Sequence, residues 1–147
     1  MNVGSILQSK GTRVVTVKRR TTIEAIVHLF HEKGIGAVVV TDDDTNVLGI
    51  VSERDIVVGL SAYGANLLNM RALQVMHQGH VACTPTDSVK TIMSWMTTRR
   101  VRHLAVVVNG ALCGIISIGD VVKKQLTDLR MEVNVLREVT TIGRART

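Results

Sequence analysis

Apolar and polar residues recur in the same order twice along this chain of 147 residues. Each copy begins with a short apolar stretch, continues with apolar positions at helical spacing, and then has two apolar strands followed by a second helix. The elements predicted for the first copy are a strand at 13–17, a helix at 22–33, strands at 35–41 and 47–51, and a helix that starts near 52. Those predicted for the second copy are a strand at 81–84, a helix at 88–99, strands at 101–108 and 112–116, and a helix that extends beyond 120. The pattern therefore predicts two units of strand, helix, strand, strand and helix.

Local signals mark the ends of several of these elements. Thr21 stands three residues before Glu24, which predicts a capping box at the start of the first helix. Asp87 is the expected cap of the corresponding helix in the second copy. Asn109 and Gly110 lie between two apolar strands, and Asn-Gly in that position is the strongest short signal for a hairpin.

These boundaries divide the chain into four parts. We expect a first domain at 3–61, a connecting helical segment at 62–76, a second domain with the C-terminal helix at 77–140, and a basic tail at 141–147. The last four residues, 144–147, are expected to be disordered because basic chain ends usually lack contacts that order them.

The C-terminal helix carries an apolar stripe. Its apolar positions are separated by four, three, four and three residues, and they are Val122, Leu126, Leu129, Val133 and Leu136. This spacing is typical of a coiled coil over about two heptads, on a helix of about 20 residues. Packing of part of the stripe on its own domain is the alternative. We expect a homodimer to which these helices contribute contacts.

Composition narrows the class of protein. Hydrophobic residues make up 46% of the chain and aromatic residues 2%, so aliphatic side chains must form the core. The three aromatic residues are too few for the stacking surfaces that single-stranded nucleic acids usually contact. No apolar run reaches the ~18 residues of a membrane span, and residues 1–10 lack the features of a signal peptide. We therefore expect a cytoplasmic protein without membrane association.

Charge and cysteine content add little further. The formal net charge of +6 allows attraction to phosphates, nucleic acid or anionic lipid, and does not choose among them. Cys83 and Cys113 have no CxxC spacing, so we interpret them as buried free thiols.

The closest internal match is between residues 49–57, GIVSERDIV, and residues 114–122, GIISIGDVV. Each segment ends a predicted strand and begins a predicted helix, and each has a Ser three residues before an Asp. Polar side chains at the start of a helix, in two symmetry-related places, favour ligand binding over catalysis.

With these two motifs, the run RRVRHL at 99–104 and the pair Val75 and Met76, the chain resembles a tandem pair of CBS domains, or Bateman module, over about 3–126. The resemblance implies an α/β (α+β) fold in which two repeats pack about a pseudo-two-fold axis, often with two modules in a disc-shaped dimer. It also implies a regulatory, non-catalytic module that binds AMP, ADP, ATP or NAD(H) in clefts between the halves. No catalytic cofactor is expected.

The Ser and Asp residues suit the parts of a nucleotide. A carboxylate can accept hydrogen bonds from both vicinal hydroxyls of ribose, so we expect Asp55 and Asp120 to bind ribose. Free backbone N–H groups at a helix start attract anions, so we expect Ser52 and Ser117 to contact phosphate. Ordinary helix capping by these residues is the alternative.

Basic residues are expected to complete the phosphate site. Arg100, Arg102 and His103 are expected to reach across a cleft toward phosphates, and so is Arg54. Arg99 fits phosphate contact and simple stabilisation of a helix C-terminus equally well. The first copy has residues 34–37, GIGA, in place of the basic run, so the two clefts are expected to be unequal.

The resemblance also implies an adenine pocket near the opening strands. The residues expected there are Val15, Val17, Ile35, Val51, Cys83, Val101 and Ile116. Ala37 and Ala105 stand where the family often has a proline, and this departure weakens the expectation about adenine packing.

Other functions were considered. An S-adenosylmethionine sensor fits the ribose and adenine sites but has no phosphate for the arginines, and a basic nucleic-acid-binding protein is a second alternative. The histidine pairs 28/31 and 77/80 have no third ligand at suitable spacing, so no metal site is expected. No GxSxG motif surrounds either Ser, and an enzyme ranks lowest. A regulated partner protein is also expected.

Overall fold

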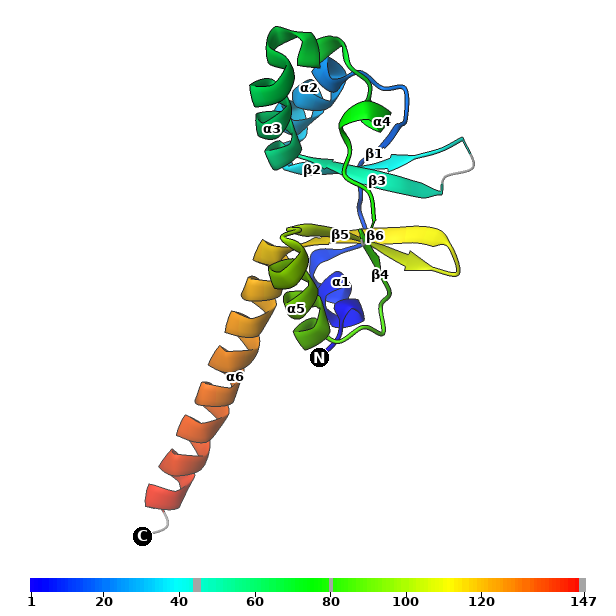
Figure 1. Ribbon diagram of the computed structural model, residues 1–147. Coiled ribbons are helices and arrows are strands. Elements are labelled where there is room, and N and C mark those ends of the chain that lie inside the picture. Colours follow the sequence, from blue (N-terminus) through cyan, green and yellow to red (C-terminus); the bar gives the residue numbers. More distant parts are fainter. Residues whose placement is uncertain (44–45, 80, 146–147) are drawn as a thin grey trace.

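Two similar halves are stacked with their sheets facing each other, and one long helix projects from the second half (Figure 1). The computed structural model describes residues 1–43, 46–79 and 81–145. The first half contains β1 (Thr16–Lys18), α2 (Ile23–Lys33), β2 (Ala37–Thr41), β3 (Val47–Ser52) and α3 (Glu53–Tyr63). The second half contains β4 (Ala82–Cys83), α5 (Val89–Arg99), β5 (His103–Val108), β6 (Ala111–Ser117) and α6 (Ile118–Ala145). The predicted mixed α/β repeat is confirmed.

Each half has a three-stranded sheet of the same topology. In the first, β1 pairs with β2 in parallel and β2 pairs with β3 antiparallel, and β4, β5 and β6 repeat this order. The two sheets meet through a cluster of small and β-branched side chains that includes Ala37, Val39, Ile50, Val81 and Ala105. The helices cover the outer faces of both sheets (Figure 1).

The two predicted caps are each wrong by one residue. Thr22, not Thr21, caps α2, because its side chain accepts a hydrogen bond from the backbone N–H of Ala25. Ser88, not Asp87, caps α5. The Asp87 carboxylate instead accepts from the Thr84 N–H at 2.8 Å, which closes the turn before the helix. The conformation of the turn before each helix decides which of two adjacent polar residues becomes the cap.

The cores of the two halves are completed by exchanged segments. The sequence pattern predicted no helix at the N-terminus, but α1 (Val3–Lys10) forms there, and its Val3, Ile6 and Leu7 lie in the core of the second half. The connecting segment, with the 3₁₀ helix η1 (Gly64–Asn69) and α4 (Ala72–Val75), contributes Leu67 and Met76 to the core of the first half. Each half is therefore completed by the segment that precedes the other half in the chain.

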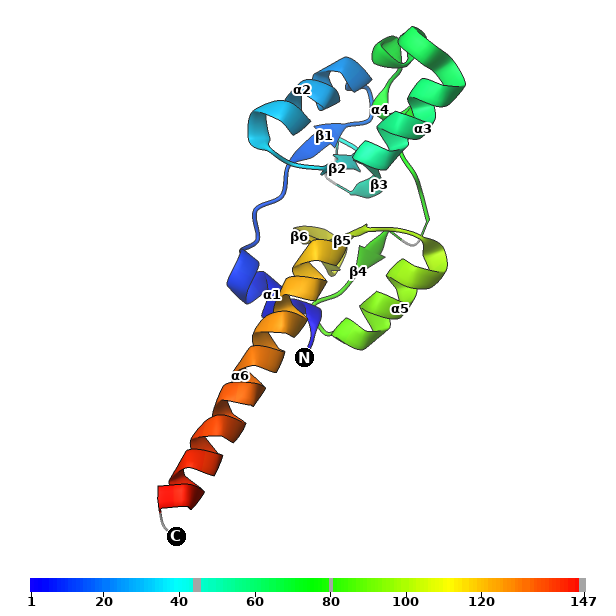
Figure 2. The same cartoon turned by 90° about the vertical axis from the view of Figure 1, so that its left-hand side faces the viewer.

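Figure 2 shows α1 beside the start of α6. α6 is 28 residues long, and its apolar stripe is 39% to 61% exposed. The helix continues to residue 145, whereas 146 and 147 lie outside the described residues, so the predicted disorder of the tail stays a prediction. Asn109 and Gly110 both have positive φ, as the predicted hairpin requires.

No helix within residues 1–43, 46–79 and 81–145 is long and apolar enough to cross a membrane.

Gly49 allows the connecting segment to lie against β3. A Cβ at this position would come within 2.6 Å of the carbonyl oxygen of His77 and 2.8 Å of the sulfur of Met76. We therefore expect Gly49→Ala to lower the free energy of unfolding by about 2 kcal/mol, since a backbone atom must move to admit the methyl group. Urea unfolding measures this. Gly143→Ala, where a Cβ meets nothing within 4 Å, is the control, and equal stability of the two variants would contradict the close contact.

Candidate functional site

Two clefts lie between the halves. The one that contains Asp55, called cleft 1, has a volume of about 800 Å³, and the one that contains Asp120, called cleft 2, has about 670 Å³. Residues at the start of α3 face the basic run of the second half in cleft 1. Residues at the start of α6 face residues 34–37 of the first half in cleft 2. The two aspartates predicted to bind ligand therefore both line large cavities.

Asp55 is held by the start of its own helix and by His77. Its carboxylate oxygen Oδ2 accepts hydrogen bonds from the Ser52 N–H at 2.8 Å, the Ser52 hydroxyl at 2.9 Å and Nδ1 of His77 at 2.8 Å. Burial raises the pKa of the Asp55 carboxyl, but the hydrogen bonds from His77 and Ser52 outweigh burial and bring its pKa below the ordinary value of 3.8. Asp55 is therefore ionised at neutral pH.

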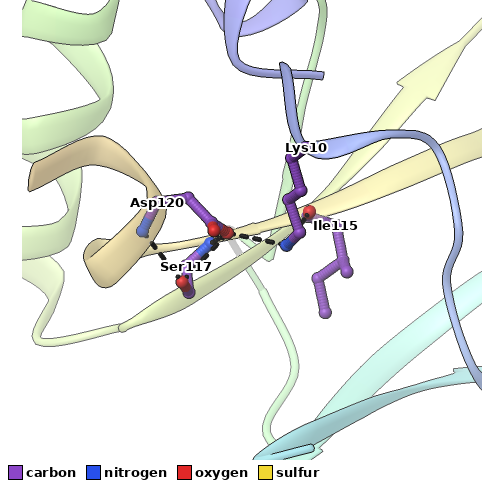
Figure 3. A network of polar contacts seen from close by, with 4 residues as sticks. All are labelled: Lys10, Ile115, Ser117 and Asp120. Atoms are coloured by element: carbon purple, nitrogen blue, oxygen red, sulfur yellow. Dashed lines mark hydrogen bonds and ion pairs between the residues drawn. The ribbon is translucent and has the colours of Figure 1, made fainter. Parts of the chain in front are cut away.

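Asp120 has the same arrangement with a different cation (Figure 3). Its Oδ2 accepts from the Ser117 N–H at 2.8 Å, the Ser117 hydroxyl at 3.0 Å and the Lys10 ammonium at 2.6 Å. Lys10 also donates to the carbonyl of Ile115 at 2.7 Å. Burial raises the pKa of the Asp120 carboxyl, but Lys10 and Ser117 outweigh burial and lower its pKa below 3.8.

One oxygen of each carboxylate is left for a ligand. In the part of the chain that the structure describes, every hydrogen bond to the carboxylates of Asp55 and Asp120 goes to Oδ2. The Oδ1 atoms keep their capacity to accept, and a carboxylate oxygen has two lone pairs. The two clefts can therefore each accept hydrogen bonds from a pair of ligand hydroxyls.

Cleft 1 holds the basic run. Arg99, Arg100, Arg102 and His103 all line it, together with Arg54. The guanidinium of Arg99 also lies 4.8 Å from the centre of the Trp95 ring, so a cation–π contact accounts for part of its role.

Arg100 has an unusual backbone conformation. It caps α5 with φ 55° and ψ 33°, in the left-handed region where Gly34 caps α2 with φ 60° and ψ 40°. Strand pairing makes these positions equivalent, because Ala37 faces Ser52 as His103 faces Ser117. A side chain in this conformation is strained by about 1 to 2 kcal/mol relative to glycine. An arginine kept here, beside a cleft, points to a functional role for its side chain.

His103 borders both clefts. It lines cleft 1 and cleft 2, and its side chain is half-buried. Burial and the nearby charge of Lys10 lower the pKa of its imidazole. The sequence predicted that His103 contributes to a phosphate site. In the structure His103 lies where a ligand in either cleft could contact it.

The structure separates the expected adenine residues into two groups. Val15 and Ile35 line cleft 2, and Val101 lines cleft 1. The other four are buried in the cores of the halves and line neither cleft; they are Val17, Val51, Cys83 and Ile116. Residues of a strand alternate in direction, so proximity to an opening strand does not decide which side chains reach a cleft.

Several cleft residues were not predicted from the sequence. They are mainly charged or polar side chains from segments that precede the opening strands or end α2, namely Lys10, Arg13, Lys33, His77 and Gln78. The basic character of 10–13 was the available signal, but no motif connected it to Asp120, which is 110 residues from Lys10.

The positions of the cysteines and histidines bear on whether a metal ion could be held. Among residues 1–43, 46–79 and 81–145, no group of three or more His, Cys, Asp or Glu side chains is placed to hold a metal ion, and His80 lies outside these residues. Burial raises the pKa of the Cys83 thiol to about 12, so this cysteine is a core side chain rather than a reactive group.

Comparison with known proteins gives one consistent family. The model of the family described as the CBS domain matches residues 3–62 and 72–127. The crystal structure of a CBS-domain containing protein from Agrobacterium tumefaciens is 43% identical, with a TM-score of 0.80, over 84% of this chain and 92% of that chain. A CBS domain protein from Pyrobaculum aerophilum, solved in complex with AMP, is 25% identical, with a TM-score of 0.71, over 82% of this chain and 89% of that one.

The first four curated relatives are longer than this chain. An uncharacterized 33.4 kDa protein of the ribosomal RNA operon of Thermofilum pendens is 37% identical over 106 residues, which is 71% of this chain and 34% of that protein. The chain spans 34% to 57% of the first four curated relatives that it matches.

The strain at Arg100 can be measured as stability. We expect Arg100→Gly to raise the free energy of unfolding by about 0.5 to 1 kcal/mol, because glycine removes the left-handed strain but makes the unfolded chain more flexible. Thermal and urea unfolding measure the change. Asn109→Gly is the matched control, since asparagine already tolerates positive φ. A clear loss of stability in Arg100→Gly would show that the arginine is kept for the fold instead.

Proposed function

Because the chain belongs to the CBS-domain family, we propose that it is a non-catalytic regulatory module that binds adenine nucleotides. The observation that carries the proposal is the pair of ionised aspartates, Asp55 and Asp120, each at the start of a helix and each lining its own cleft. In both, Oδ2 is occupied by protein donors, and Oδ1 is left to accept from the vicinal hydroxyls of ribose.

The phosphate site is proposed on the opposite wall of cleft 1. Arg100 and Arg102 come from the second half and face the start of α3 in the first. A guanidinium binds phosphate oxygens through two parallel hydrogen bonds, and the strained backbone of Arg100 supports such a role. Complex formation of the Pyrobaculum aerophilum relative with AMP supports an adenine nucleotide as the ligand class.

Ser52 and Ser117 already cap their helices, so their hydroxyls are engaged in hydrogen bonds before any phosphate binds. The Ser52 and Ser117 hydroxyls donate to the aspartates and accept from the aspartate N–H groups, at 3.4 Å in the first case and 3.1 Å in the second. Their contact with phosphate stays a prediction. It requires that a ligand replaces or adds to these hydrogen bonds at the helix start.

The two clefts are proposed to prefer different ligands. Cleft 1 combines four arginines with His103, which suits a nucleotide with several phosphates, such as ATP or NAD(H). Cleft 2 has Lys10, Arg13 and Lys33, and it has the apolar residues Val15 and Ile35 beside them. Cleft 2 therefore suits a ligand with fewer phosphates, such as AMP. S-adenosylmethionine would leave the arginines of cleft 1 without a phosphate partner.

We further propose that the module is a homodimer through α6. The stripe of five apolar residues on α6 is 39% to 61% exposed, and the helix projects away from the rest of the chain (Figure 1). The spacing of the stripe fits the seam of a two-stranded coiled coil. A second copy of the helix would remove this apolar surface from water. Binding of nucleotide in the clefts would then reach a partner protein as a change in how the two modules are arranged.

Nucleotide binding is tested by titration of AMP, ATP and NADH in a calorimeter. We expect saturable binding by the unaltered chain, and a loss of one class of site in each of Asp55→Ala and Asp120→Ala. Loss of a charge-assisted hydrogen bond costs about 1.5 to 3 kcal/mol, or about 10-fold to 150-fold in affinity. Arg100→Gly, which is expected to stay folded, should weaken binding of the polyphosphate more than binding of AMP. Absence of saturable binding by the unaltered chain would reject the proposed function.

The dimer is tested by light scattering after size-exclusion chromatography. Leu129→Lys places a charge in the middle of the stripe and should shift the mass toward that of a monomer, since a buried unpaired charge is strongly unfavourable. Asn134→Lys adds the same charge on another face of α6 and is the control. An unchanged mass for Leu129→Lys would contradict the proposed role of α6.

A further inference from the structure

The same arrangement in the two clefts uses two different cations. Asp55 is held by Nδ1 of His77 at 2.8 Å, and Asp120 by Nζ of Lys10 at 2.6 Å. Lys10 ends α1 before the first repeat, and His77 follows α4 before the second repeat. Each cation therefore belongs to the segment that is exchanged between the halves, and it crosses to the aspartate of the other half. The clefts differ in that an imidazole changes its charge near neutral pH while an ammonium group does not.

His77 is held through its backbone and through one nitrogen of its ring. Its backbone N–H donates to the Ile50 carbonyl at 3.0 Å, and its own carbonyl accepts from the Ile50 N–H at 3.2 Å. Because Asp55 is an ionised acceptor, Nδ1 of His77 must carry the hydrogen of their bond. The other ring nitrogen, Nε2, is then an acceptor in the neutral ring and a donor in the protonated ring.

Nε2 of His77 has no partner in the protein. It is buried, and among the described residues nothing forms a hydrogen bond with it. A buried polar atom without a partner marks a place where water, an ion or a ligand completes the site. His77 lines cleft 1, so a ligand bound there is a suitable partner.

The charged groups near His77 are those that line cleft 1 together with it. Two are acidic, four are arginines and one is a second histidine: Asp55, Glu53, Arg54, Arg99, Arg100, Arg102 and His103. Asp55 is bonded to His77 directly. His103 interacts electrostatically with His77, and it also borders cleft 2, so its own titration affects both clefts.

Resting on the proposed nucleotide binding, we propose that His77 makes binding in cleft 1 more dependent on pH than binding in cleft 2, where the ammonium group of Lys10 stands in place of the imidazole. Protonation of His77 adds a positive charge and an N–H donor to a cleft that takes an anionic ligand, while the ion pair with Asp55 keeps the carboxylate ionised. An anionic nucleotide is therefore bound more tightly in cleft 1 when His77 carries the additional proton, which a lower pH favours.

The experiment measures AMP binding to one cleft at a time. Asp120→Ala isolates cleft 1 and Asp55→Ala isolates cleft 2, and the dissociation constant is measured by calorimetry at about pH 5.5 and about pH 8. The phosphate of AMP also gains a proton near pH 6, but it does so for both clefts. For each cleft, the dissociation constant at the higher pH is divided by that at the lower pH. Comparison of the two quotients cancels the effect of the phosphate and reports how much more the affinity of cleft 1 depends on pH. We expect cleft 1 to weaken about tenfold more than cleft 2 on going to the higher pH.

Exchange of the two cations gives the sharpest controls. His77→Lys, in the Asp120→Ala chain, keeps a donor to Asp55 and should make the pH response of cleft 1 match that of cleft 2. Lys10→His, in the Asp55→Ala chain, should give cleft 2 the stronger response. His77→Asn, which can still donate to Asp55 but cannot gain a proton, is a second variant should the lysine prevent folding.

The outcomes separate the two proposals. No saturable binding of AMP, ATP or NADH by the unaltered chain or by either variant would reject the proposed function itself. AMP binding in both clefts with equal pH response, or binding in cleft 2 alone, would overturn the role of His77 and leave the nucleotide-binding function intact. An unchanged response of cleft 1 in a folded His77→Lys or His77→Asn chain would overturn it as well.

Discussion

The packing of one sheet on the other is the constraint on which the rest of the structure depends. Ala37, Val39, Ile50, Val81 and Ala105 form a buried cluster between the halves. Because these side chains are short, the two strand pairs can approach closely, and the starts of α3 and α6 come to face the opposite half. This contact holds the sheets of the two halves together, and the clefts lie between the halves. Binding and any signal it produces therefore depend on the interface between the repeats as much as on either repeat.

Exchange of segments makes that interface more than a contact between sheets. α1 fills the core of the second half, and the connecting segment fills the core of the first. The same segments end in Lys10 and His77, which hold the two aspartates. The hydrophobic part of each segment thus fixes the position of the cation that follows it. A change in cleft occupancy can act on the packing of these segments, because cation and core residues lie a few residues apart.

The difference between the clefts comes from small changes in a repeated design. Gly34 and Arg100 occupy equivalent left-handed positions, but only Arg100 adds a charged side chain there. Lys10 and His77 make the same bond to equivalent carboxylates, but one provides an ammonium group and the other an imidazole. A duplicated unit can therefore provide two sites of different charge and different response with the same backbone.

The sequence by itself determined the two repeats, the order of their elements, the hairpin at Asn109, and the Ser and Asp pairs at the helix starts. Each of these follows from a local pattern, because periodicity and turn chemistry act over a few residues. The caps of α2 and α5 were displaced by one residue, since a neighbouring turn decided between adjacent polar side chains. Only the tertiary structure decided that Val17, Val51, Cys83 and Ile116 belong to the cores and that Lys10 reaches Asp120. These outcomes depend on which face of a strand meets the other half and on contacts between residues far apart in the chain, and no local pattern carries that information.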